Sequence, residues 1–122
     1  MLAGFIVMGP QFALAKDFTA PMNSSREIAR FYALNDDCSS VGETVVRITS
    51  QPRHGTASVK LGRDHPNLPQ SNPHNVCNVR TVQTTQVWYK PERNYVGRDS
   101  VAVDVIHANG TSKQETVNID VR

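Results

Sequence analysis

The clearest pattern in the chain is a strict alternation of apolar and polar positions near its C-terminus. Residues 100–107 and 115–121 each repeat with a period of two, which is the period of a β-strand with one buried face. Between them stands Asn109-Gly110, a pair that readily adopts the positive φ angles of a type I′ turn. The pattern therefore predicts a closing β-hairpin. Its inward residues are expected to be Val101, Val103, Val105, Val117, Ile119 and Val121.

Shorter segments upstream have a similar strand-like composition. Residues 43–50 are rich in β-branched side chains, and residues 56–61 follow a turn that contains proline and glycine. Residues 26–34 fit either a short helix or a strand, and we favour a strand because the neighbouring strands need a partner. Residues 76–82 and 83–89 also have strand character. About seven short strands with regular turn signals predict an all-β sandwich.

One long segment, residues 62–75, has the composition of a loop. It holds three prolines, two histidines and almost no apolar residues. A loop of this length in a compact domain is usually either functional or disordered, and we expect it to contact a partner together with Trp88 on a nearby strand. Trp88 is either an exposed anchor or a residue that the loop covers. The candidate partner-binding residues are His65, Asn67, Leu68, His74 and Trp88.

The first fifteen residues are apolar and uncharged. They end in Ala13-Leu14-Ala15, a small-x-small pattern that predicts a cleaved secretory signal peptide over residues 1–15. The usual basic start is missing, which indicates a late start codon or a truncated leader; the alternative is a buried first strand or helix. The segment is too short to span a membrane, so we expect no membrane span after cleavage. Residues 16–25 would then be an extended lead-in to a sandwich at residues 26–122.

Cysteine content and net charge narrow the class of protein. The two cysteines, Cys38 and Cys77, predict a disulfide in an exported protein, since two isolated thiols supply too few ligands for a metal. We therefore expect a periplasmic, secreted or cell-surface location. The formal charge is +2 and the basic residues are scattered, so no nucleic-acid partner is expected.

Two spaced motifs resemble those of a known family. They read Gln51-Pro52-x-His54-Gly55-Thr56 and Tyr89-x-Pro91-x-x-x-Tyr95-x-Gly97-x-Asp99-Ser100. With the Asn-Gly turn and the Val-rich last strand, they resemble one unit of the bacterial cadherin-like, immunoglobulin-like repeats, here as a single exported unit. The resemblance implies an Ig-like sandwich with Tyr89 and Tyr95 in the core, and a spacer or adhesive role.

The chain departs from that family in three features that bear on function. It has the insertion at residues 62–75, a cysteine pair that common repeats lack, and Asn109-Gly110 where the family commonly has Asp-Gly. Some family members bind calcium, and the acidic residues here could supply oxygen ligands. We expect these acids to stabilise turns or face solvent instead, and we expect no metal or cofactor. The acidic residues concerned are Asp36, Asp37, Asp99 and Asp104.

No pattern in the sequence points to catalysis. His65 and His74 do not have a compact zinc-site spacing, and no serine or cysteine lies in a nucleophile-elbow context. We expect a non-enzymatic binding or adhesion module that recognises a protein or glycan through residues 62–75. The alternatives are an assembly subunit that docks onto an envelope complex by its edge strands, or a hydrolase inhibitor. The sequence leaves the oligomeric state open.

Overall fold

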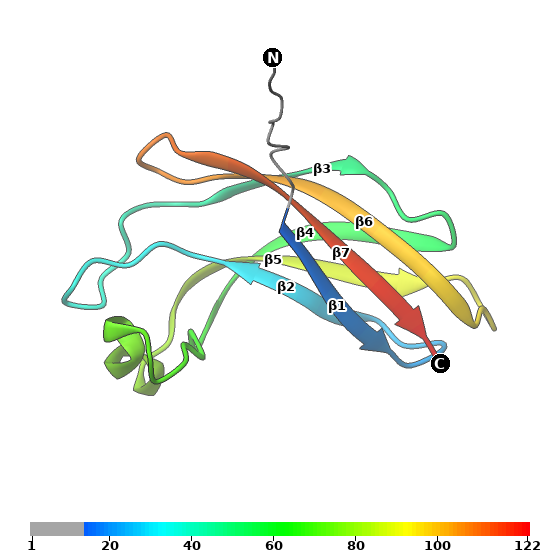
Figure 1. Ribbon diagram of the computed structural model, residues 1–122, viewed down its shortest axis with the longest axis horizontal. Coiled ribbons are helices and arrows are strands. Elements are labelled where there is room, and N and C mark those ends of the chain that lie inside the picture. Colours follow the sequence, from blue (N-terminus) through cyan, green and yellow to red (C-terminus); the bar gives the residue numbers. More distant parts are fainter. Residues whose placement is uncertain (1–13) are drawn as a thin grey trace, which may run out of the picture.

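The computed structural model describes the backbone from residue 14 and the side chains from residue 16 to the C-terminus. Its strands form two facing sheets, which confirms the predicted β-sandwich (Figure 1). A short 3-10 helix, η2, lies between the fourth and fifth strands. The elements are β1 (Leu14–Ala20), β2 (Arg26–Phe31), β3 (Val45–Ser50), β4 (Gly55–Asp64), η2 (Pro73–Val79), β5 (Val82–Pro91), β6 (Gly97–Ile106) and β7 (Ser112–Val121).

Each sheet brings together strands that are distant in sequence. One sheet has the order β1-β7-β6-β3, and the other has the order β2-β5-β4. β1 runs parallel to β7, whereas the other neighbours are antiparallel.

Within the described residues, no helix is long and apolar enough to cross a membrane. Most of the predicted signal peptide lies outside the described residues, so it stays a prediction. Strand β1 begins at Leu14, one residue before the expected end of that peptide at Ala15.

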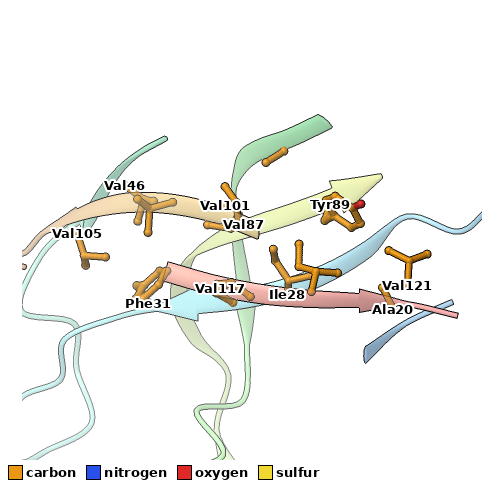
Figure 2. Packing of buried hydrophobic residues seen from close by; sticks show 14 residues of the cluster. Ala20, Ile28, Phe31, Val46, Val87, Tyr89, Val101, Val105, Val117 and Val121 are labelled. Carbon is orange, nitrogen blue, oxygen red and sulfur yellow. The ribbon is translucent and has the colours of Figure 1, made fainter. Parts of the chain in front are cut away.

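The closing hairpin supplies six of the fourteen residues in the buried core cluster. Val103, Val105 and Val117 have no exposed surface, and Ile119 is 1% exposed, as the period-two pattern predicts. They meet β2 and β5 from the facing sheet, which contribute Ile28, Phe31, Val87 and Tyr89 (Figure 2). Residues 26–34 are therefore a strand over most of their length rather than a helix.

The turn of this hairpin differs from the predicted type I′ geometry. Gly110 has φ +91°, whereas Asn109 is not among the residues with positive φ. The amide of Gly110 donates to the carbonyl of His107, and Asn109 Oδ1 accepts from the Thr111 amide. Residues 107–110 thus form a turn that ends in a glycine with positive φ. The amide of His107 donates to the carbonyl of Thr111, so three residues, 108–110, connect the two strands, which is a common hairpin connection. The Asn109 side chain stabilises it by bonding its own backbone two residues ahead.

Two predictions for residues 62–82 are wrong in their boundaries. Gly62 and Asp64 pair with β5 and belong to β4, so the predicted loop begins too early. The predicted strand at 76–82 is instead helical up to Val79, and β5 begins at Val82. Asn72 explains the difference, because its side chain accepts the amide hydrogen of His74 and caps η2, with Pro73 as the first helical residue.

The two motifs of the family resemblance meet around one carboxylate. Asp99 accepts hydrogen bonds from the amides of Arg53 and His54, at 2.9 and 3.1 Å, and from the buried phenol of Tyr89 at 2.7 Å. His54 also stacks on Tyr95, with ring centroids 4.2 Å apart. The β3–β4 turn is thereby fixed to the start of β6. These motif residues have a structural role, and Asp99 stabilises the turn at residues 51–55.

Burial and this hydrogen bond change the titration of Tyr89. Desolvation is the larger cause, followed by the bond to Asp99, and together they raise the pKa of the Tyr89 phenol well above its ordinary value. Because the folded protein favours the neutral phenol, the corresponding stabilisation is present below the unfolded pKa of about 10 and is lost at higher pH.

Candidate functional site

The segment between β4 and β5, residues 65–81, is an ordered loop that we call the tethered loop. The Cys38–Cys77 disulfide joins it to the β2–β3 connection, which confirms the predicted pairing. His74 Nε2 lies 2.9 Å from Asp36 Oδ1, and Arg80 Nη1 donates to the Asp37 carbonyl at 3.2 Å. Three contacts thus fix one side of the loop to residues 36–38.

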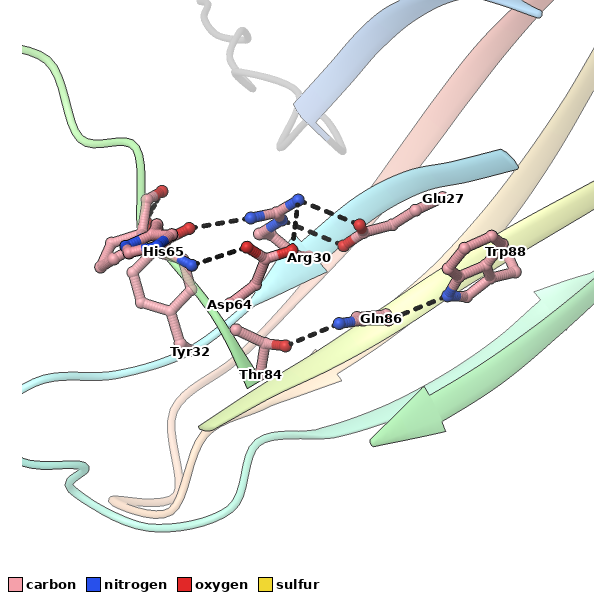
Figure 3. A network of polar contacts seen from close by, with 9 residues as sticks. Glu27, Arg30, Tyr32, Asp64, His65, Thr84, Gln86 and Trp88 are labelled. Atoms are coloured by element: carbon pink, nitrogen blue, oxygen red, sulfur yellow. Dashed lines mark hydrogen bonds and ion pairs between the residues drawn. The ribbon is translucent and has the colours of Figure 1, made fainter. Parts of the chain in front are cut away.

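The base of the tethered loop is fixed to β2. Arg30 Nη1 donates to the carbonyl of His65 at 2.8 Å, and the Tyr32 hydroxyl donates to the carbonyl of Pro66 at 2.8 Å (Figure 3). Burial raises the pKa of Tyr32, and the nearby Arg30 charge offsets part of that rise. The Tyr32 phenol therefore remains a donor at neutral pH. With the contacts to residues 36–38, these bonds to β2 and Tyr32 hold the tethered loop from two sides.

A reciprocal pair of hydrogen bonds crosses the tethered loop internally. Asn78 Nδ2 donates to the Leu68 carbonyl at 2.8 Å, and the Leu68 amide donates to Asn78 Oδ1 at 2.7 Å. The carbonyl of Asn78 lies 2.9 Å from His65 Nδ1. His65 and Leu68, predicted to contact a partner, are therefore brought together mainly as parts of the loop framework. His74 lies apart from them, against Asp36.

The sequence pattern does not predict two exposed valines on the tethered loop. Val76 is 65% exposed and Val79 is 84% exposed, although a strand was predicted there. Residues three apart eclipse in a 3-10 helix, so both project from the same side of η2. Asn67 is also exposed and takes a left-handed backbone with φ +61°. The loop thus presents a small apolar surface on a fixed backbone.

A row of polar side chains runs along the outer face of β5. Because Val87 and Tyr89 point into the core, Gln86 and Trp88 point outward. Trp88 Nε1 donates to Gln86 Oε1 at 2.9 Å, and Gln86 Nε2 donates to Thr84 Oγ1 at 3.1 Å (Figure 3). Gln86 is largely buried beside Gly62, where an added Cβ would lie 2.7 Å from Gln86 Nε2. The row fixes the orientation of the Trp88 ring.

A shallow hollow of about 170 Å³ lies beside Trp88, and we call it the Trp88 pocket. Its side chains carry an aromatic ring, two ammonium groups and three hydroxyls, with the ammonium of Lys60 4.6 Å from the centroid of the Trp88 ring. The side chains that give the pocket this character are Ser25, Thr56, Ser58, Lys60, Trp88 and Lys90.

Ion pairs lie between the Trp88 pocket and the tethered loop. Arg30 makes two 3.0 Å hydrogen bonds to Glu27 and an ion pair of 3.2 Å with Asp64. Glu27 is the cross-strand neighbour of Trp88, and the same Arg30 bonds the His65 carbonyl. The loop and the pocket therefore belong to one face of the β2-β5-β4 sheet. Among the described residues, no hydrogen bond or ion pair joins Trp88 directly to the loop; its polar contacts are with Gln86 and Lys60.

The acidic residues weighed as calcium ligands have other partners. Asp36 lies against His74, Asp99 accepts the amides of the 51–55 turn, and Asp104 is the cross-strand neighbour of Arg47. Hydrogen bonds from the Ser39 hydroxyl and amide hold the pKa of Asp37 below its usual value. Across residues 16–122, no group of three or more His, Cys, Asp or Glu side chains is placed to hold a metal ion.

Comparison with known proteins adds little to this picture. No protein-family model matches the chain, and no curated protein matches it in sequence. A solved structure titled "Solution Structure of Amebosin" is similar with a TM-score of 0.45 and 10% identity; the likeness covers 93% of this chain and 100% of that one. At that score the two folds are too distant for either protein to inform the other.

Proposed function

We propose that this protein is an exported, non-enzymatic binding module of the immunoglobulin-like, cadherin-like kind. It recognises a glycan or protein through the face that the tethered loop and the Trp88 pocket share. The observation that carries the proposal is that the loop is preformed, held by a disulfide and by hydrogen bonds on two sides. A preformed loop loses little conformational entropy when it binds, so a small surface suffices.

The strand order supports the immunoglobulin-like part of the proposal. In such sandwiches the second, fifth and fourth strands form one sheet, and the third, sixth and seventh form the other. The orders β2-β5-β4 and β7-β6-β3 agree with this arrangement, with β1 added beside β7. The disulfide supports export, because such bonds persist in oxidising compartments.

Replacing residues 67–75 with a short Gly-Ser link tests the proposal. The sandwich should stay folded, because β4, β5 and both cysteines are retained. Binding to immobilised polysaccharides or extracellular-matrix proteins should fall at least tenfold relative to the wild-type chain, since the replacement removes Asn67 and the Asn72 cap that starts η2 and so presents its exposed valines. Circular dichroism checks folding, and surface plasmon resonance measures affinity.

The matched control for this replacement is Glu92→Ser with Arg93→Ser, a change in the exposed turn that follows the other end of β5. This control should bind like the wild-type chain. A loop-replaced protein that folds and keeps wild-type affinity would exclude the loop as the recognition element.

One observation favours a second candidate, an assembly subunit that docks by an edge strand. β4 is a ten-residue strand at the edge of its sheet, with Val59 38% and Leu61 59% exposed. Unpaired edges of this length can accept a strand from another chain. Under this alternative, binding depends on β4 and survives the loop replacement.

A further inference from the structure

We propose that the Trp88 pocket binds an acidic sugar, a uronate or sialate residue that carries a carboxylate. This rests on the proposed function and specifies the ligand for one part of the recognition face. The pocket combines a fixed aromatic ring, hydroxyl groups and ammonium groups, and each of these matches a different part of such a sugar.

The charge of the pocket selects an acidic ligand. Two lysines, Lys60 and Lys90, line it, and no carboxylate does. Neither lysine makes an ion pair within residues 16–122. Glu27, the cross-strand neighbour of Trp88, is held in two hydrogen bonds by Arg30, so its charge is already compensated. The two ammonium groups are therefore available to a ligand carboxylate.

The aromatic ring and the hydroxyls suit the body of a sugar. One face of a pyranose ring presents C–H groups that pack on an aromatic surface, and its rim presents hydroxyls. Trp88 offers the surface, and its bond to Gln86 holds the ring in place before binding. Ser25, Thr56 and Ser58 offer hydrogen bonds at the rim.

Lys60 links the two halves of the site. In the free protein its ammonium lies over the Trp88 ring, a weak contact where solvent competes. A bound carboxylate would draw this ammonium off the ring, and the apolar sugar face would take its place. The ligand would thus exchange one weak contact for an ion pair and a stacking contact.

The size of the pocket limits the ligand to a single ring. Its volume of about 170 Å³ lies below the range of about 300–1,000 Å³ that is usual for drug-sized ligands. Affinity for one sugar should therefore be weak, and a polymer should bind more tightly because it presents many copies of the acidic residue to the pocket. An extended acidic polysaccharide is the expected natural form.

Trp88 is the single tryptophan of the chain, so its fluorescence reports this pocket alone. The experiment titrates the full chain with oligogalacturonate and, separately, with a neutral galacto-oligosaccharide of the same length. We expect a saturable fluorescence change with the acidic sugar, at an affinity at least tenfold above that for the neutral one. The affinity should also fall as salt is raised, because the pairing is exposed.

Charge variants test the assignment of the lysines. Lys60→Met with Lys90→Met should weaken oligogalacturonate binding about tenfold in calorimetry, since exposed charge pairs contribute modestly. The control Arg47→Gln removes one positive charge from β3, in the other sheet, and should bind like the wild-type chain. Its unchanged affinity would show that the lysines act locally rather than through net charge.

Three results would contradict the inference while leaving the proposed function standing. Equal affinity for the acidic and neutral sugars would remove the acidic class. No saturable change with either sugar, in a protein whose loop-dependent binding to another partner persists, would remove the pocket as a sugar site. If the two-lysine variant kept wild-type affinity for oligogalacturonate, the assignment of the carboxylate would also fail.

Discussion

Loss of the Cys38–Cys77 disulfide should lower the free energy of unfolding by about 4 kcal/mol. The bond closes a loop with a sequence separation of 39 residues, and a loop of this length restricts the unfolded chain by about that amount in the chain-entropy model. This is a large share of the stability of a small domain. Urea unfolding of the oxidised protein and of Cys38→Ser with Cys77→Ser measures the difference.

Loss of the disulfide should loosen the tethered loop more than it loosens the sandwich. His74 and Arg80 also hold the loop to residues 36–37, but both contacts are exposed and weaker than a covalent bond. Hydrogen exchange in the double variant should therefore speed up first at η2. Two reactive thiols in denatured protein without reductant, or equal unfolding midpoints for both proteins, would contradict the prediction.

Asp99→Ala should destabilise the protein by roughly 3 kcal/mol. The substitution removes the acceptor for Arg53, His54 and the Tyr89 phenol, and it leaves a buried hydroxyl without its partner. It should also bring the pKa of Tyr89 down toward its ordinary value, although burial will keep it raised. Chemical unfolding measures the first effect, and phenolate absorbance during alkaline titration measures the second.

The matched control is Asp104→Ala, on the other side of the same strand. Asp104 alternates with the core valines of β6 and faces outward, so its removal should change stability by less than about 0.5 kcal/mol. If both substitutions cost the same, Asp99 would not be the residue that joins the β3–β4 turn to β6.

The sequence is a good guide where one physical rule decides the structure. The hairpin of β6 and β7 could be predicted because burial of one sheet face leaves a period of two that local turns do not disturb. The predicted type I′ turn of this hairpin is wrong, since Asn-Gly favours two turn geometries and the strand register decides between them. The disulfide pairing followed from the count of cysteines alone.

The region around the site was less predictable because competing signals meet there. Val76 and Val79 favour a strand by composition, yet Asn72-Pro73 starts a helix just before them, and that start signal decides the outcome. The composition of residues 62–75 predicts a loop from Gly62, although Gly62 pairs with Thr84 as part of β4, where it lies beside the Gln86 side chain. The row from Thr84 to Trp88 depends on cross-strand neighbours, which no local pattern in the sequence reveals.

Our central claim is that the partner is recognised by the face that the tethered loop and the Trp88 pocket share, and not by the edge strand β4. Two single substitutions test this claim most directly. Trp88→Ala removes the aromatic ring of the pocket, and Leu61→Lys places a charge on the exposed edge strand β4. Both proteins are measured by surface plasmon resonance against the polysaccharide or matrix protein that the wild-type chain binds. We predict at least a tenfold loss of affinity for Trp88→Ala and wild-type affinity for Leu61→Lys. Loss of binding in Leu61→Lys, with wild-type affinity in Trp88→Ala, would contradict the account and favour docking through the edge of β4.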